Sequence, residues 1–145
     1  MSAVQGPTLK TVVRFVSVES NPAKLACICD VIGQHFSNRQ RILVLAPSPE
    51  AARYIDNLLW SFSEESFLPH TVADHNSKEA IVVTTLVRNL NRAQVLVNLC
   101  PQACPIAEQF EIVCELLDKT HPDKESLSRQ RMAAYLVSGL QVAME

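Results

Sequence analysis

Short apolar segments alternate with amphipathic segments along most of the chain. Residues 11–18 are rich in β-branched side chains and predict a first strand. Apolar runs at residues 41–46, 80–84 and 94–99 predict three more strands, and a loosely alternating run at 111–116 predicts a fifth. The runs are nearly uninterrupted, which is typical of parallel strands that are covered on both faces.

Two amphipathic segments between these runs predict helices. Asn21 and Pro22 predict the start of the first helix, with the asparagine as N-cap, because a proline at the first helical position loses no hydrogen bond. This helix extends to about Phe36. Ser48 and Pro49 repeat the signal, and apolar residues at helical spacing follow both starts.

The second half of the chain completes the alternation. Residues 104–110 are long enough for only a short helix, and a final helix is predicted over residues 126–143. We therefore predict a three-layer, Rossmann-like α/β fold, with a mostly parallel sheet of about five strands and helices on both faces. Residues 1–8 contain Gly and Pro without periodicity and predict a flexible N-terminal arm, followed by a single domain at 9–145.

Composition narrows the functional classes. The chain has 145 residues, 48% of them hydrophobic, which suits one domain with its own core. Its formal net charge of -2 disfavours direct binding to many phosphates of a nucleic acid. Basic residues nevertheless gather near the C-terminus and indicate either an ordinary solvated helix face or a site for an acidic partner: Lys119, Lys124, Arg129 and Arg131, against Asp123 and Glu125.

The five cysteines are expected to be reduced and mostly buried. The sequence shows no apolar secretion signal and no apolar run of about 18 residues, so we expect a cytoplasmic protein with no membrane segment. Cys27 and Cys29 would point to different faces of a helix, and Cys100 and Cys104 lack a second pair of ligands. We expect neither a metal nor a cofactor.

The turns after the first two strands exclude a phosphate-binding loop. Residues 18–22 contain no glycine but include a glutamate and a proline, and residues 46–50 contain two prolines. No Gly-x-Ser-x-Gly motif is present, and His35 is assigned to the polar side of the first helix. A Cys/His pair brought together by folding stays open. We expect no catalytic site.

The segment around Trp60 is the most informative. This tryptophan, the only one in the chain, ends the second helix, and Phe67, Pro69 and His70 follow in a stretch without periodicity. Large aromatic residues in such a stretch either pack beneath the loop as a small satellite core or are displayed for a partner.

The same residues carry a family resemblance. The sequences Ile55-Asp56-Asn57-Leu58-Leu59-Trp60 and Ser66-Phe67-Leu68-Pro69-His70 resemble the signature of the chi subunit family of bacterial DNA polymerase III. The similarity continues in the predicted strands at 41–46 and 94–99 and in the last helix, with Arg129-Gln130-Arg131 and Ala134-Tyr135.

The resemblance implies a non-catalytic accessory subunit with a Rossmann-like fold that holds no nucleotide. Chi-like proteins bind the acidic C-terminal tail of the single-stranded-DNA-binding protein, and some bind the psi subunit of the clamp loader or a helicase. Such a protein contacts single-stranded DNA only indirectly. The implied tail-binding residues are Lys124, Arg129, Arg131 and Met132, and the implied surface for psi or the helicase is Trp60, Phe67, Pro69 and His70.

Two positions depart from the family pattern. Met132 stands where a tyrosine is expected, and Ala133 stands where a lysine is found in the best-known member. We therefore expect weak tail binding or an altered register. The alternatives are a chi-like interaction module with a different partner, or a small α/β enzyme with a polar pocket near His70.

Overall fold

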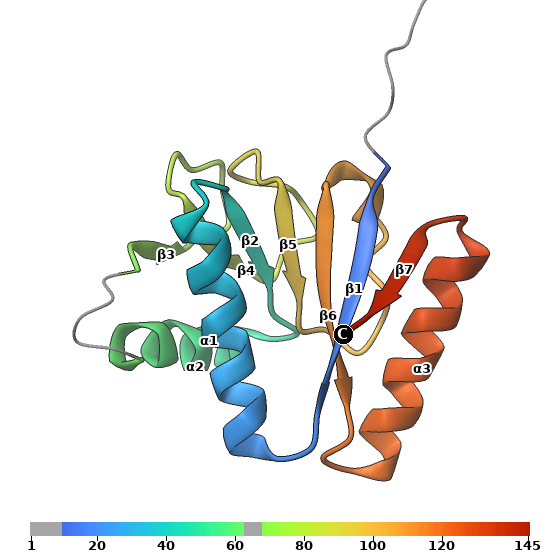
Figure 1. Cartoon of the computed structure of the whole chain (residues 1–145). Coiled ribbons are helices and arrows are strands. Elements are labelled where there is room, and N and C mark those ends of the chain that lie inside the picture. The colour runs from blue at the N-terminus through green and yellow to red at the C-terminus, as the bar shows by residue number, and fades with distance from the viewer. Residues whose placement is uncertain (1–9, 63–67) are drawn as a thin grey trace, which may run out of the picture.

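A single seven-stranded sheet forms the centre of the molecule. The structure, a computed structural model, describes residues 10–62 and 68–145. The strand order is β3-β4-β2-β5-β6-β1-β7, and all the pairings are parallel (Figure 1). The strands are β1 (Val12–Val18), β2 (Ile42–Leu45), β3 (His70–Val72), β4 (Ile81–Thr84), β5 (Val95–Asn98), β6 (Ile112–Asp118) and β7 (Gln141–Met144). The helices are α1 (Asn21–Ser37), α2 (Pro49–Ser61), the short 3-10 helix η1 (Ala107–Gln109) and α3 (Pro122–Val137).

The two faces of the sheet are covered by different elements. Ile42 and Val44 of β2 belong to one apolar cluster, with residues of α1 and α2, whereas Leu43 and Leu45 belong to a second cluster that includes Tyr135 of α3. Successive side chains of a strand point to opposite faces, so these clusters lie on the two sides of the sheet. Figure 1 shows α1 and α2 together on the near side. The predicted three-layer α/β architecture is confirmed.

Serine side chains begin both long helices of the near face. The Ser20 hydroxyl accepts a hydrogen bond from the Ala23 amide at 3.2 Å, and Ser48 does the same for Ala51 at 3.1 Å. The prediction was right for the second helix. For α1 it was wrong by one residue, because Ser20 and not Asn21 is the N-cap.

The sheet has two more strands than the sequence predicted, one at each edge. β3 has only three residues, and β7 forms from residues that were assigned to the end of the final helix. α3 instead starts at Pro122 and ends at Val137, and Gly139 follows with a φ of 83°, in the left-handed region that suits glycine. The chain can then turn back and pair β7 with β1.

The predicted arm at residues 1–8 lies outside the described residues, as does Phe67. No helix of the described part is long and apolar enough to cross a bilayer.

Candidate functional site

A cavity of about 580 Å³ opens at the carboxyl edge of the sheet. Its walls come from the segments that follow β2 and β5, from the end of β6, and from α1, α2 and α3. Neighbouring strands send their connections to opposite faces here, and this is where parallel sheets commonly bind ligands. The wall is mostly apolar and includes Leu25, Ile28, Tyr54, Ile55, Leu99 and Leu127. Four charged residues also line it: Lys24, Asp118, Lys124 and Arg131.

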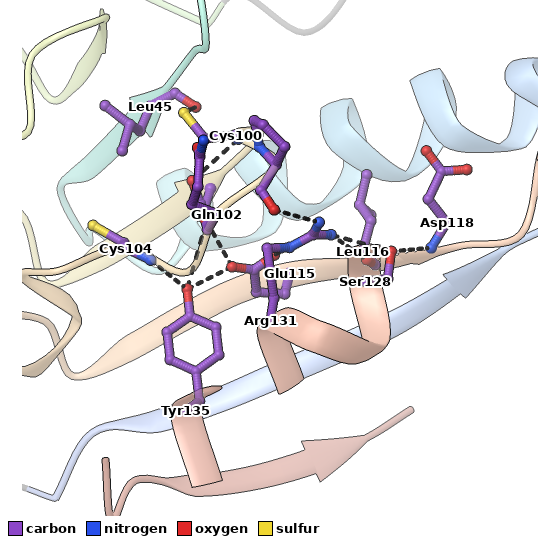
Figure 2. A network of polar contacts seen from close by, with 12 residues as sticks. Leu45, Cys100, Gln102, Cys104, Glu115, Leu116, Asp118, Ser128, Arg131 and Tyr135 are labelled. Carbon is purple, nitrogen blue, oxygen red and sulfur yellow. Dashed lines mark hydrogen bonds and ion pairs between the residues drawn. The ribbon is translucent and has the colours of Figure 1, made fainter. Parts of the chain in front are cut away.

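A buried glutamate lies next to this cavity and organises a polar network (Figure 2). Glu115 of β6 is 1% exposed. One carboxylate oxygen accepts a hydrogen bond from Arg131 Nε at 2.9 Å. The other accepts from the Tyr135 hydroxyl at 2.6 Å and from Asn98 Nδ2 at 2.7 Å. Three donors from β5 and α3 therefore converge on one carboxylate inside the protein.

Arg131 ties α3 to the carboxyl edge of the sheet. Besides Glu115, its guanidinium donates to the carbonyl oxygens of Leu116 at 3.0 Å and Pro101 at 3.3 Å, and to the Ser128 hydroxyl at 3.2 Å. The residue is only 8% exposed. Nε and both terminal nitrogens of Arg131 donate hydrogen bonds to oxygens of the protein itself. Arg131 therefore acts mainly as an internal anchor.

Burial sets the protonation of this network. It raises the pKa of Glu115 above the usual 4.5, although Arg131 and the hydrogen bonds of Tyr135 and Asn98 act in the opposite direction. Burial and the Glu115 carboxylate also raise the pKa of Tyr135. The tyrosine hydroxyl thus keeps its proton and serves as a donor to Glu115.

A second ion pair stands at the wall of the cavity. Lys24 Nζ lies 2.7 Å from an Asp118 carboxylate oxygen, and the other oxygen accepts hydrogen bonds from the amide and hydroxyl of Thr120. Burial alone would raise the pKa of Asp118, but Lys24 and Thr120 outweigh it and lower the pKa to about 2. Asp118 is therefore a carboxylate whose charge is already balanced.

The exposed side of α3 carries a shallow groove that does not share residues with the cavity. Its lining consists of Pro122, Glu125, Ser126, Arg129, Gln130 and Ala133. Arg129 donates to a Glu125 carboxylate oxygen from Nε at 3.2 Å and from a terminal nitrogen at 2.8 Å. This pair joins positions one helical turn apart and is exposed, so a competing carboxylate could displace Glu125 at a cost of about 1 kcal/mol or less.

The four residues implied for tail binding do not share one surface. Arg129 lies in the α3 groove, and Lys124 is exposed at the cavity. Arg131 lies within the polar network, and Met132 packs, partly buried, against the core beneath α3. Helical spacing alone could have separated Arg129 from Arg131, because residues two apart on a helix do not face each other.

A second surface is formed by the end of α2 and by β3. Trp60 is 54% exposed, and its ring lies 4.3 Å from that of His70, centroid to centroid. His70 is buried, with Nδ1 2.6 Å from the Leu68 carbonyl oxygen and Nε2 3.0 Å from an Asp56 carboxylate oxygen. Pro69 is half-buried beside it. Other apolar side chains on these elements and just after α2 are also exposed: Tyr54, Phe62 and Val72.

One Cys/His contact does occur, at a place the sequence did not predict. His35 is buried, which corrects its assignment to the polar side of the helix. Its Nδ1 donates to Gln40 Oε1 at 2.6 Å, so Nε2 is left to accept from the Cys114 thiol, whose sulfur is 3.8 Å away. Burial raises the pKa of Cys114 to about 12, and this keeps the sulfur as a thiol, the opposite of what a nucleophile needs.

No set of three or more His, Cys, Asp or Glu side chains within residues 10–62 and 68–145 could hold a metal ion. The five cysteines are all free thiols, and none forms a disulfide with another.

Comparison with known proteins identifies the family. A sequence model of "DNA polymerase III chi subunit, HolC" matches residues 11–143. The chain belongs to the chi subunit family of DNA polymerase III. It is 25% identical over 115 residues to DNA polymerase III subunit chi of Escherichia coli strain K12, which covers 77% of this chain and 78% of that protein. It is 22% identical over 126 residues to DNA polymerase III subunit chi of Pseudomonas aeruginosa PAO1, covering 86% and 88%.

Membership of the chi family confirms the predicted resemblance and places the chain among accessory subunits of DNA replication. The family match covers all seven strands except the last residue of β7. The exposed Trp60 and Arg129 thus belong to a chi-type domain.

Proposed function

We propose that this chi-family chain is a non-catalytic accessory subunit that connects two proteins at a replication fork in the cytoplasm. One partner is the single-stranded-DNA-binding protein, bound through its acidic C-terminal tail. The other is a psi-like clamp-loader subunit or a helicase. The chain would then associate with single-stranded DNA only through its partner. The observation that carries the proposal is the exposure of Trp60, because a large aromatic side chain that is 54% exposed suits a protein interface.

The tail would bind along α3, where Lys124 and Arg129 are both exposed. Arg129 presents a planar guanidinium that suits a carboxylate, and Glu125, its present partner, would compete with the tail carboxylate for it. A tail carboxylate would replace Glu125 and gain a charge-assisted hydrogen bond. Arg131 would contribute by fixing the orientation of α3, and Met132 by supporting the helix from beneath.

A calorimetric titration with a tail peptide tests this half of the proposal. Arg129→Ala should weaken binding about ten- to hundredfold, the value of one charged hydrogen bond. Glu125→Gln should strengthen binding by up to about fivefold, because it removes the competing charge. Arg53→Ala, which removes an exposed arginine from α2, is the matched control and should change nothing. If the unmutated protein does not bind the peptide, the tail partner is excluded.

The second partner would dock on Trp60, with Pro69 and His70 holding the shape of the surface and Phe67 adding to it. Trp60→Ala and Phe67→Ala should abolish capture of a psi-like subunit or helicase. For Trp60→Ala the melting temperature should change by only a few degrees, since the ring is more than half exposed. Leu136→Ala, an exposed leucine on α3, is the control. A large drop in melting temperature would instead assign Trp60 to the core.

A further inference from the structure

Basic residues gather at the amino edge of the sheet, the edge opposite to the cavity. Figure 1 shows this edge as the end from which the arrows of the strands start. The central strands β4, β2 and β5 are neighbours, with Ile42 in register with Ile81 and with Val95, so the segments that lead into them meet there. These segments contain four cations, which we call the amino-edge cluster: Arg39, Arg41, Lys78 and Arg92.

Hydrogen bonds join the three segments into one surface. The Arg41 guanidinium donates to the carbonyl oxygen of Lys78 at 2.8 Å, and the Arg41 amide donates to Gln94 Oε1 at 2.7 Å. Asn91, which precedes Arg92, donates from Nδ2 to the carbonyl oxygen of Glu79 at 3.1 Å. The backbone that carries the cluster is therefore fixed to the sheet on both sides of β2.

The cluster carries positive charge that is not balanced locally. Arg39, Lys78 and Arg92 are exposed, and no cation of the cluster has an ion-pair partner in the part of the chain that the structure describes. The acids in the same segments and at the start of the neighbouring β6 are Glu79 and Glu111. Four cations and two acids leave two positive charges, in a chain whose formal net charge is -2.

Two of the arginines have a backbone conformation that suits glycine better. Arg39 has a φ of 60° and Arg92 a φ of 52°, and among the described residues no other side-chain-bearing residue lies in the left-handed region. Arg39 follows α1, where glycine is common and where the helix dipole favours a cation. Arg92 lies between β4 and β5 and follows no helix. The fold thus gives only a small reason for an arginine at position 39 and none at position 92.

The chemistry of the cluster suits a phosphate backbone. Guanidinium and ammonium groups donate charge-assisted hydrogen bonds to phosphate oxygens. The large apolar side chains that are exposed on the described chain all lie outside these three segments. A protein partner would need such side chains as anchors, and single-stranded DNA would need aromatic rings on which its bases stack. The phosphates of a DNA duplex require neither.

We propose that the amino-edge cluster binds the phosphate backbone of double-stranded DNA without reading its sequence. This goes beyond the proposed function, in which the chain reaches single-stranded DNA through a partner. Neighbouring strands are about 5 Å apart, so the cluster spans about 10 Å and contacts only a few phosphates, in agreement with the negative net charge of the whole chain. The contact is weak by itself and becomes effective when partner proteins hold the chain beside a duplex, because tethering raises the local concentration.

Fluorescence anisotropy with a labelled DNA duplex, in the absence of other proteins, tests the proposal. The logarithm of the association constant should fall with the logarithm of the salt concentration with a slope of about -3, as expected for three or four phosphate contacts. The double variant Arg39→Gly/Arg92→Gly should weaken binding about tenfold or more and bring the slope to about -1. Arg53→Ala, which removes an exposed arginine from α2, is the matched control and should change neither value.

Thermal unfolding separates a role in binding from a role in the fold. Glycine adopts the left-handed conformation without steric cost, so the double variant should melt at the same temperature as the unmutated protein or above it. Lys78→Gln removes a cation at a residue outside the left-handed region and should weaken duplex binding severalfold with no change in melting temperature. A lower melting temperature of the double variant would show that the two arginines serve the fold, and it would overturn the proposal.

Three further outcomes would also overturn it. The first is that the unmutated protein does not bind the duplex, and the second is that the double variant binds it equally well. The third concerns the class of partner, for which a single-stranded oligonucleotide of the same length and a polyglutamate peptide are titrated in parallel. If either binds more tightly than the duplex and loses that binding in the double variant, the cluster is a site for that partner and not for double-stranded DNA.

Discussion

The ion pair between Glu115 and Arg131 allows the clearest prediction about stability. Replacing Arg131 with Met keeps most of the side-chain volume but removes the cation that faces a carboxylate 1% exposed to solvent. The carbonyl oxygens of Pro101 and Leu116 also lose a donor. Leaving one member of a buried ion pair without its partner costs about 3–5 kcal/mol, a large part of the roughly 5–15 kcal/mol that stabilises a domain.

The neighbouring Arg129 provides an internal control. It lies on the same helix, and its only hydrogen bonds in the described structure go to Glu125 on the surface. Arg129→Met should therefore lower the free energy of unfolding by about 1 kcal/mol or less. The two variants remove the same chemical group two residues apart, so the difference between them measures the effect of burial.

The cost of Arg131→Met should depend on pH. Burial already raises the pKa of Glu115, and removing Arg131 raises it further, because the cation favours the ionised form. The folded state then holds a proton that the unfolded state has lost, so the free energy of unfolding falls as pH rises from about 4.5 to the folded pKa, by about 1.4 kcal/mol per pH unit. Below about pH 4.5 the carboxyl is neutral in both states and this contribution disappears.

Urea unfolding at pH 5 and pH 8 tests the prediction. Arg131→Met should lose more stability at pH 8 than at pH 5, and adding Glu115→Gln should restore part of that loss, since no charge is then left buried. If Arg131→Met costs no more than Arg129→Met at pH 8, or if its cost does not change with pH, the reasoning about the buried charge is refuted.

Three further predictions concern other groups. Lys24→Met should lower the free energy of unfolding by about 1–2 kcal/mol at pH 6 and by little near pH 2. The reason is that the pKa of Asp118 is lowered to about 2, so the stability that this carboxylate contributes is lost as pH falls from 3.8 through that value. Urea titrations at both pH values check this, and an equal loss at both would contradict it. Burial raises the pKa of Cys114 to about 12, so at pH 8 this thiol should react with iodoacetamide only as fast as the protein unfolds. Mass spectrometry after timed quenching measures the rate, and rapid labelling of the folded protein would contradict the burial of Cys114. His70→Ala should lower the free energy of unfolding by about 1–3 kcal/mol, because the Leu68 carbonyl loses its hydrogen-bond partner and Trp60 loses the ring beside it. Thermal unfolding measures the loss, and a melting temperature like that of the unmutated protein would count against the prediction.

The sequence predicted the central strands and the order of elements because their signals are local. An uninterrupted aliphatic run such as residues 42–46 is typical of a strand buried on both faces, and a polar cap residue followed by proline, as at Ser48 and Pro49, predicts a helix start. The edge strands lack such signals. β7 is only partly buried, and its sequence continues the helical pattern of α3, so Gly139 and the pairing with β1 decide its structure.

The functional residues show the same division. Trp60 and the basic residues of the last helix could be found from the sequence alone, because their residue types and the family signature are local properties. The environments of the functional residues could not be predicted from the sequence. Glu115 lies within a predicted strand and Arg131 within a predicted helix, and only the packing of α3 on β6 brings the two charges to 2.9 Å and buries them. The sequence thus determined the family and the layers of the fold, whereas the tertiary structure decided which arginine is an anchor inside and which is available to a partner.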